Sequence, residues 1–207
     1  MPDDDIAREA ARRQASHDHH ASNRTLRRDQ DGVYANRIGL RGEEAWCREF
    51  GGKVDLTPRP GGDGGRDAWI TIGGRRHPVD CKTANAPKEL IVEVERRGKP
   101  VCKPNTIYVL CGYNPDRDRA HLLGWQWGHV LMQSWPKSHG YGVMNYWQAR
   151  GQLQKIDELH RLAKTPLGIA LLAEAERNRP RPFRGCCIVC GQPGLYVGWY
   201  CEDHRVW

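Results

Sequence analysis

Residues 61–83 read GGDGGRDAWITIGGRRHPVDCKT, and this stretch predicts the β-hairpin around which we expect the chain to fold. A glycine-rich turn comes before the strand AWITI, and Gly73-Gly74 separates that strand from a second one that ends in DCKT. A Gly-Gly pair suits the tight turns that join antiparallel strands, because both positions accept a positive φ. Such a turn brings the start of the first strand beside the end of the second.

The two ends that the hairpin brings together carry charged side chains. Asp67 opens the first strand, whereas Asp80 and Lys82 close the second, with Cys81 between them on the opposite face. Two carboxylates in one small volume repel each other unless a cation lies between them, and hard oxygen ligands suit Mg²⁺ or Mn²⁺. A lysine beside that cation can orient a water or stabilise charge on a reacting phosphate. The hairpin therefore predicts a divalent-metal site next to an amine.

A third carboxylate comes from the segment before the hairpin. Residues 38–51 predict a short amphipathic helix with a glycine stop signal at its end. Glu43 lies on the apolar face of this helix, at helical spacing from Trp46 and Phe50. An ionised carboxylate on a buried face is costly unless it has a partner. Glu44 lies about 100° round the helix and points elsewhere.

The hairpin residues resemble the motifs of the PD-(D/E)xK nuclease superfamily, which has the restriction-endonuclease-like fold. The matching residues are Asp67 and, after 12 intervening residues, Asp80-Cys81-Lys82. One position departs from the motif, because Arg66 rather than Pro precedes Asp67. Asp63 competes with Asp67 for the first role, but only Asp67 is followed directly by a strand, whereas Asp63 lies among turn glycines.

The resemblance implies a mixed β-sheet flanked by helices and the activity of a metal-dependent DNA endonuclease. Superfamily members typically carry a metal-linked Glu on the first helix, a position that Glu43 matches, with Glu44 as the alternative. A water activated by Mg²⁺ (or Mn²⁺) would attack phosphorus with help from Lys82, leaving 5′-phosphate ends. In compact size the chain is similar to phage-type and resolvase-type members. The implied metal ligands are the carboxylates of Glu43, Asp67 and Asp80 and the backbone carbonyl of Cys81.

The pattern around the hairpin predicts further elements of one α/β domain over residues 36–178. Apolar or alternating runs predict a sheet of about five or six strands. Helical patterns follow near the end of the domain. The strands expected beside the hairpin are 53–56, 89–95, 106–111 and 120–125, and the helices are 155–162 and 167–177.

Basic and aromatic side chains indicate a polyanionic partner, most simply nucleic acid, and the resemblance implies that it is DNA. The formal net charge is +7 and the pI is about 9.1, a balance that favours a polyanion. Residues 125–150 are rich in Trp, Tyr and His, which can stack on bases, although we expect several of them to cover the sheet. The candidate phosphate contacts are Arg75, Arg76, Lys88, Arg96, Arg97, Arg181 and Arg184.

Residues 179–207 follow a charged, proline-broken linker and carry a cluster of metal ligands. Cys187-x2-Cys190 and Cys201-x2-His204 have the spacing of a Zn²⁺ site, with Cys186 as an alternative to Cys187. Four protein ligands leave no open position, so we expect the zinc to be structural and to supply folding energy. The segment resembles small zinc-ribbon or treble-clef modules, and the spacing does not choose between them.

The rest of the sequence gives expectations for the N-terminal segment, for membrane spans and for the cellular compartment. Residues 1–35 are polar and predict a flexible or partner-ordered arm. No apolar leader and no run of about 18 apolar residues is present, so we expect no membrane span. Scattered single cysteines beside one metal-like cluster are typical of a reduced protein. We therefore expect a cytoplasmic location, in a bacterium or a phage-infected host cell.

Several functions stay open on the residues alone. The first is the Mg²⁺-dependent endonuclease. The second is a resolvase selective for junctions or flaps, or a nickase guided by a partner. The third is a catalytically silent DNA-binding or assembly protein on the nuclease fold. A homodimer, and a protein partner bound by the N-terminal arm or the zinc module, also stay open.

Overall fold

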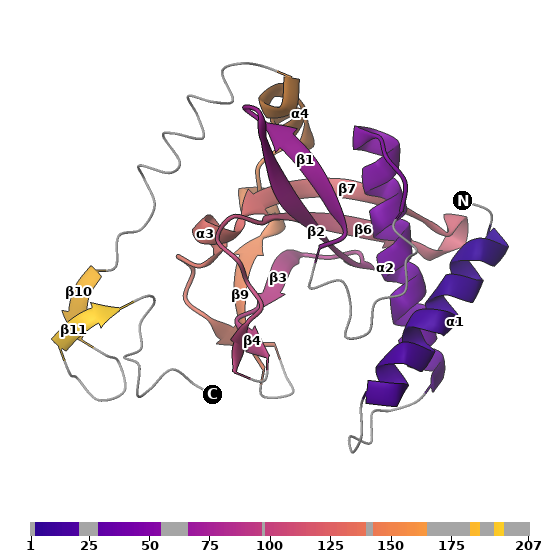
Figure 1. Cartoon of the computed structure of the whole chain (residues 1–207), viewed down its shortest axis with the longest axis horizontal. Coiled ribbons are helices and arrows are strands. Elements are labelled where there is room, and N and C mark those ends of the chain that lie inside the picture. The colour runs from indigo at the N-terminus through magenta and orange to yellow at the C-terminus, as the bar shows by residue number, and fades with distance from the viewer. Residues whose placement is uncertain are drawn as a thin grey trace.

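The protein has a central four-stranded mixed β-sheet packed against helices (Figure 1). The strand order is β1-β2-β6-β7, in which β2 and β6 are parallel and the other two pairs are antiparallel. The strands are β1 (Ala68–Ile72), β2 (Arg75–Asn85), β6 (Ile107–Asn114) and β7 (Arg119–Trp127). This sheet confirms the predicted α/β class. The computed structural model describes residues 3–20, 29–54, 66–96, 98–139, 143–164, 183–186 and 193–196.

The predicted hairpin is formed by β1 and β2. Gly73 and Gly74 connect the strands with φ values of 57° and 78°, the left-handed conformation that a two-residue hairpin turn requires. The shorter strand β1 begins with Ala68 opposite Val79, whereas β2 runs on to Asn85. The last half of β2 therefore has β6 on one side and, within the hairpin, no β1 residue on the other.

One face of the central sheet is covered by helices. Helix α2 (Asp29–Phe50) ends at the predicted glycines, since Gly51 and Gly52 have φ values of 81° and 103°. Helix α4 (Ile156–Lys164) confirms the helix predicted at 155–162. The buried cluster beneath these helices consists of Trp46, Ile70, Ile72, Val79, Cys81, Ile107, Val109, Cys111, Trp125 and Leu159.

The opposite face is covered by a second sheet, which the sequence did not predict. Its strands are β3 (Glu89–Glu93), β9 (Met144–Ala149) and β8 (Lys137–Ser138), in the order β3-β9-β8. Leu90 and Val92 of β3 pack on Tyr108 and Leu110 of β6. The expected single sheet of five or six strands was wrong here, because the 89–95 strand packs against the central sheet instead of joining its edge. Burial on both faces explains why β6 is apolar throughout.

Several short elements complete the described part of the chain. Residues 51–54 have no regular structure, and the rest of the expected 53–56 strand lies outside the described residues, as does the 167–177 helix. None of the described helices is both long and apolar enough to cross a membrane. The remaining elements are β4 (Glu95–Arg96), β5 (Lys99–Pro100), η1 (Pro115–Arg117), α3 (Gly128–Leu131), η2 (Arg150–Gln152), β10 (Phe183–Cys186) and β11 (Pro193–Tyr196).

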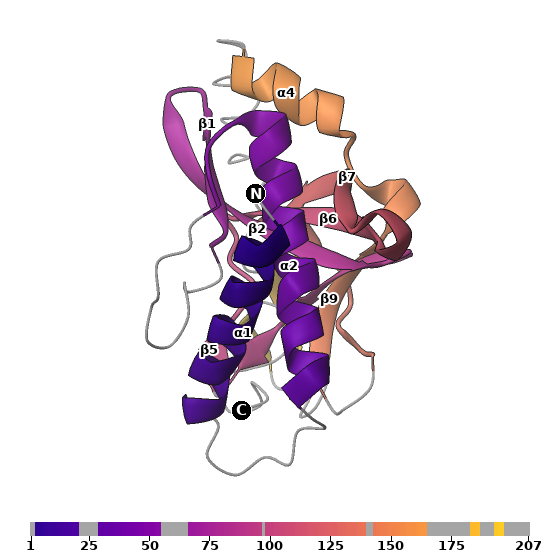
Figure 2. The same ribbon diagram turned by 90° about the vertical axis from the view of Figure 1, so that its right-hand side faces the viewer.

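The N-terminal segment differs from the expected flexible arm. Helix α1 (Asp3–His20) lies beside α2 in both ribbon views (Figures 1 and 2). Ile6 and Ala10 are fully buried in a small cluster with Leu40 of α2. Two apolar residues one turn apart are enough for docking, because α2 is longer than predicted and offers them an apolar surface. The expected domain boundary at residue 35 falls inside α2.

An ion-pair cluster fixes α2 against the turn between β6 and β7. Arg37 and Arg41 of α2 both donate to the carboxylate of Asp118, and the Tyr113 hydroxyl donates to it at 2.5 Å. Although burial opposes its charge, the bonds from Arg41 and Arg37 lower the pKa of Asp118 well below its ordinary value. This contact helps to set the position of α2, and thus of Glu43, relative to the sheet.

The C-terminal segment is described only in part. Strands β10 and β11 pair as a two-stranded antiparallel sheet. The predicted zinc ligands Cys187, Cys190, Cys201 and His204 lie outside the described residues. The zinc module therefore stays a prediction.

Candidate active site

Asp67 stands where β1 stops pairing with β2. Its backbone N–H donates to the Val79 carbonyl at 2.8 Å, and its Oδ2 accepts a hydrogen bond from the Cys81 N–H at 2.6 Å. The Asp67 side chain thus takes the place that a further β1 residue would occupy along β2. The hairpin register therefore holds this carboxylate directly beside the Asp80-Cys81-Lys82 motif.

The same bond indicates where the Cys81 carbonyl points. In an extended strand, the N–H and C=O of one residue point to the same side. Since the Cys81 N–H points to Asp67, the Cys81 carbonyl also faces the edge of β2 on which Asp67 lies. The role of metal ligand that the resemblance implied for that carbonyl stays a prediction.

Asp80 and Lys82 lie on one face of β2, as strand alternation predicted. Asp80 is only 3% exposed, and its Oδ1 lies 2.7 Å from Nζ of the half-buried Lys82. Although burial opposes its charge, the negative charges of Asp80 and Asp67 raise the pKa of Lys82. Lys82 is therefore an ammonium group at neutral pH, and it can donate a hydrogen bond but cannot accept a proton.

Glu43 reaches the site because α2 approaches β2 closely. A Cβ added to Gly42 would lie 1.9 Å from Oγ1 of Thr83 on β2, so only glycine permits this approach. Glu43 is 5% exposed and is held by both terminal nitrogens of the Arg13 guanidinium on α1, at 2.6 and 3.2 Å. The buried carboxylate that the helix pattern predicted thus has an arginine partner.

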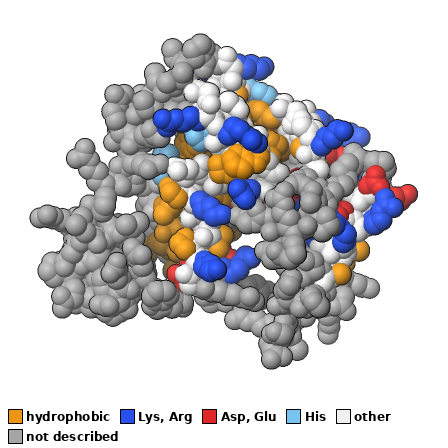
Figure 3. All heavy atoms as spheres, in the orientation of Figure 1, with side chains coloured by type: hydrophobic (Ala, Val, Ile, Leu, Met, Phe, Trp, Pro, Cys, Tyr) orange, Lys and Arg blue, Asp and Glu red, His pale blue; other side chains and the backbone are white. Residues whose placement is uncertain are grey.

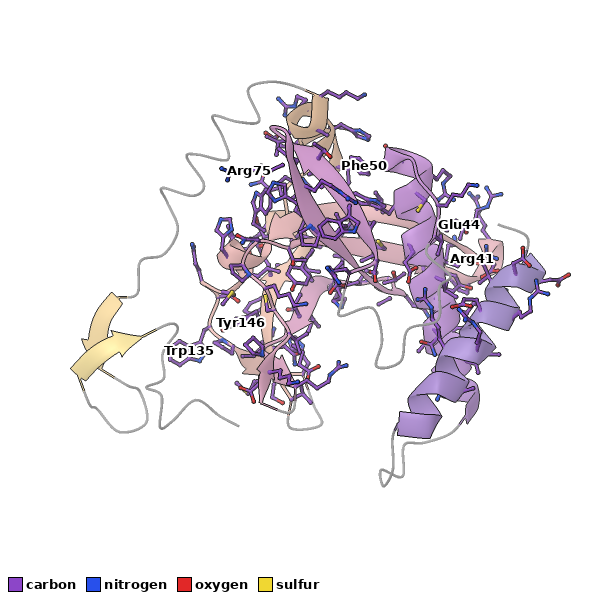
Figure 4. All side chains as sticks on the ribbon, in the orientation of Figure 1. Arg41, Glu44, Phe50, Arg75, Trp135 and Tyr146 are labelled. Carbon is purple, nitrogen blue, oxygen red and sulfur yellow. The ribbon has the colours of Figure 1, made fainter. Side chains whose placement is uncertain are left out.

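Glu44 and Asp63 were the alternatives to Glu43 and Asp67 as metal ligands. Glu44 lies 3.0 Å from Arg41 on the same helix, and both are labelled in Figure 4. The charge that acts on Asp67 from α2 is that of Glu43. Asp63 lies outside the described residues.

Asp67 lies within electrostatic range of the two other carboxylates, Asp80 and Glu43. Burial of the Asp67 carboxyl group is the largest cause that raises its pKa well above the ordinary value, and the negative charges of Asp80 and Glu43 add to it. The Cys81 N–H and the Lys82 ammonium oppose this shift. Strands β1 and β2 and helix α2 thus place Asp80 and Glu43 within electrostatic range of Asp67, whereas their convergence on one ion stays a prediction.

The donors have the right chemistry for a hard divalent cation, although their present arrangement is not a coordination shell. In the described part of the chain, no group of three or more His, Cys, Asp or Glu side chains is arranged to hold a metal ion. Arg13 engages Glu43, and Lys82 engages Asp80, so these carboxylates face cations of the chain instead of one shared point. Clustered, desolvated carboxylate oxygens nevertheless fit Mg²⁺ or Mn²⁺.

A pocket of about 380 Å³ opens beside Asp67, between the end of α2 and the edge strand β1. This volume is within the range of small-ligand sites, about 300–1,000 Å³. Both acidic and basic residues line it, so a polar ligand suits it better than an apolar one. The lining residues are Trp46, Cys47, Gly51, Gly52, Lys53, Arg66, Asp67, Ala68 and Trp69.

The predicted phosphate contacts are only partly near this site. Arg75 and Arg76 are exposed on the hairpin, and Lys88 is exposed just before β3. Arg96 lies on the separate β4–β5 ribbon and bonds Glu93 at 2.6 Å. Arg97 and Arg181 lie outside the described residues, and for Arg184 only the strand is described.

Two residues that the sequence analysis did not single out border the site. Arg13 was missed because residues 1–35 were interpreted as an arm, yet Ile6, Ala10 and Arg13 have the i, i+4, i+7 spacing of one helix face. Trp69 lies outside residues 125–150, the aromatic-rich stretch in which base-stacking side chains were expected. Alternation along AWITI would have placed it opposite the buried Ile70.

Comparison of this chain with protein-family models, with curated proteins and with solved structures finds no match.

We predict that the ionised Asp67 carboxylate destabilises the folded state. A carboxyl group with a raised pKa in the folded state is destabilising when ionised, and this cost grows as the pH rises from about 4 through the raised pKa. Without divalent metal, Asp67→Asn should therefore raise Tm at pH 7 by about 2–4 °C, the effect of about 1 kcal/mol in a chain of this size. The difference should disappear near pH 4.

Thermal melts in EDTA over pH 4–8 measure this effect. The exposed Asp116→Asn is the matched control and should leave Tm unchanged at every pH. A Tm for Asp67→Asn at or below that of the wild type at pH 7 would contradict the electrostatic account of the site.

Proposed function

We propose that the protein is a metal-dependent DNA endonuclease of the PD-(D/E)xK type, which hydrolyses phosphodiester bonds. The observation that supports this most strongly is the desolvated Asp67 carboxylate, beside Asp80 and within the field of Glu43, next to an ammonium group. A stable protein gains nothing from such mutual repulsion, whereas perturbed carboxylates of this kind are typical of functional sites.

The proposed metal ligands are oxygen atoms of this cluster. The carboxylates of Glu43, Asp67 and Asp80 and the carbonyl of Cys81 would hold Mg²⁺ or Mn²⁺. When bound, such a cation acts as a Lewis acid on the phosphate and lowers the pKa of a coordinated water. The chain's own contribution is to hold these oxygens together in a site that is largely withdrawn from solvent.

Lys82 contributes a fixed positive charge. Because Asp80 and Asp67 favour its protonated form, Lys82 would donate a hydrogen bond to a non-bridging phosphate oxygen or orient the attacking water. It would not serve as the general base. Its bond to Asp80 holds the ammonium group near the position where negative charge develops during phosphoryl transfer.

The surroundings support a nucleic-acid substrate. The formal net charge of +7 favours a polyanion, and Arg75 and Arg76 would contact phosphates beside the site. The four cysteines whose side chains the structure describes are all free thiols, which supports a reducing cytoplasm. A structural zinc at Cys187, Cys190, Cys201 and His204 completes the proposal.

A plasmid-nicking assay tests the nuclease proposal. The wild type should convert supercoiled DNA in Mg²⁺ or Mn²⁺ but not in EDTA. Asp80→Asn and Lys82→Ala should each slow nicking by about 100-fold or more, because the first removes a proposed metal ligand and the second removes a positive charge that would stabilise the transition state. Asp116→Asn should match the wild type. If the wild type and Asp80→Asn are equally inert across metals and DNA forms, the DNA-binding or assembly alternative replaces the enzyme.

We expect the Arg13–Glu43 contact to raise the Mg²⁺ concentration that nicking requires. Arg13 and a divalent cation would compete for the same carboxylate oxygens of Glu43. Arg13→Ala should therefore lower the Mg²⁺ concentration for half-maximal nicking by about tenfold, equivalent to a net contact of about 1.4 kcal/mol. Arg12→Ala is the matched control, because Arg12 bonds Glu9 on the same helix. A Mg²⁺ requirement that is unchanged or higher in Arg13→Ala would exclude Glu43 as a metal ligand.

A further inference from the structure

Trp69 is a large aromatic side chain on the outer strand of the central sheet. It is 45% exposed, although its neighbours Ile70 and Ile72 on the same strand are buried. Strand alternation explains the difference, because Trp69 points away from the face that α2 and α4 cover. The indole of Trp69 therefore lies at the surface of the hairpin.

Two guanidinium groups lie against the Trp69 ring. Cζ of Arg76 is 4.7 Å from the ring centroid, and Cζ of Arg66 is 5.5 Å from it. These are cation–π distances. Within the part of the chain that the structure describes, neither arginine is ion-paired with a carboxylate. The two positive charges thus lie over the exposed ring, and a base that stacks on the ring would displace them toward its own phosphate groups.

The position of Trp69 links it to the proposed catalytic residues. It pairs with Pro78 and so lies on the same face of the hairpin as Asp80 and Lys82. It also lines the 380 Å³ pocket together with Asp67 and Arg66. Residues two apart on a strand are separated by about 6.6 Å, so a ligand that contacts Asp67 can contact Trp69 one nucleotide away. Figure 3 shows hydrophobic side chains bordered by Lys and Arg on the face that carries the hairpin.

These features match how proteins hold unpaired bases. Every base has a flat face that stacks on an aromatic ring, and flanking Arg or Lys groups follow the phosphates. In a continuous duplex both faces of each base are already stacked on neighbouring bases, so no face is presented to a side chain. A stacking ring beside a phosphate-cutting centre therefore selects strands in which a base is free.

We propose that Trp69 is the stacking platform for one unpaired base next to the cleaved phosphate, with Arg66 and Arg76 on the flanking phosphates. The substrate is then single-stranded or locally unpaired DNA, such as a flap or a junction, and not continuous duplex. The choice of substrate chemistry rests on the proposed nuclease function, whereas the stacking itself does not.

Binding of fluorescein-labelled 15-nucleotide DNA tests this inference in Ca²⁺, with gels to verify that the DNA stays intact. The wild type should bind the single strand about tenfold more tightly than the matching duplex. Trp69→Ala should lower the single-strand affinity by about tenfold, which is the contribution expected of one stacked base. Trp69→Phe should stay within about threefold of the wild type, because a phenyl ring also stacks. A single 2-aminopurine in the strand should be quenched by the wild type and not by Trp69→Ala.

Tyr34→Ala is the matched control. Tyr34 of α2 is 45% exposed, as Trp69 is, and its ring packs edge-on against Tyr113 near the end of β6. Its substitution should change neither binding nor quenching. Equal single-strand affinity of the wild type and Trp69→Ala, or equal affinity of the wild type for duplex and single strand, would overturn the inference.

The same experiments separate this inference from the nuclease proposal. If binding depends on Trp69 but no metal supports nicking, the stacking site stands and the enzymatic proposal fails. If the wild type nicks DNA while Trp69→Ala binds single strands normally, the enzyme stands and the stacking site fails.

Discussion

The hydrogen bond from the Cys81 amide to the Asp67 carboxylate is the contact on which the site depends. It exists because β1 begins at Ala68, opposite Val79, so no β1 residue lies opposite Cys81, and the Asp67 side chain accepts the bond from that amide. The bond holds one carboxylate at a fixed place beside another, in surroundings that strip water from both. The backbone register of the hairpin thereby determines that the carboxylates of Asp67 and Asp80 lie close together.

Negative charge of this kind must be balanced, and two cations of the chain contribute. Lys82 comes from within the motif and neutralises Asp80, whereas Arg13 comes from a separate helix and neutralises Glu43. The balance leaves Asp67 without an ion-pair partner among the described residues, and burial together with the negative charges of Asp80 and Glu43 disfavours its ionised form. The same imbalance that weakens the fold would favour a bound divalent cation, as expected where stability and function compete.

The sequence was sufficient for the hairpin, the long apolar strand β6 and the end of α2, because each depends on local signals: glycine at positive φ, hydrophobic periodicity and alternation. It was insufficient for the second sheet, because a strand that packs on a sheet and a strand that joins its edge have the same pattern. It also failed for α1, whose docking requires only Ile6 and Ala10 and depends on α2 extending back to Asp29. Arg13 reaches Glu43 only because α1 docks on α2, and a contact between two helices cannot be predicted from a local sequence pattern.

The most direct test of the central claim is a crystal of the protein soaked in Mn²⁺, with anomalous scattering used to locate the ion. The account predicts one Mn²⁺ within about 2.0–2.3 Å of oxygens from Asp67 and Asp80, with Glu43 turned away from Arg13 toward the ion. Absence of Mn²⁺ at this position, or carboxylates of Asp67 and Asp80 more than about 10 Å apart, would contradict it.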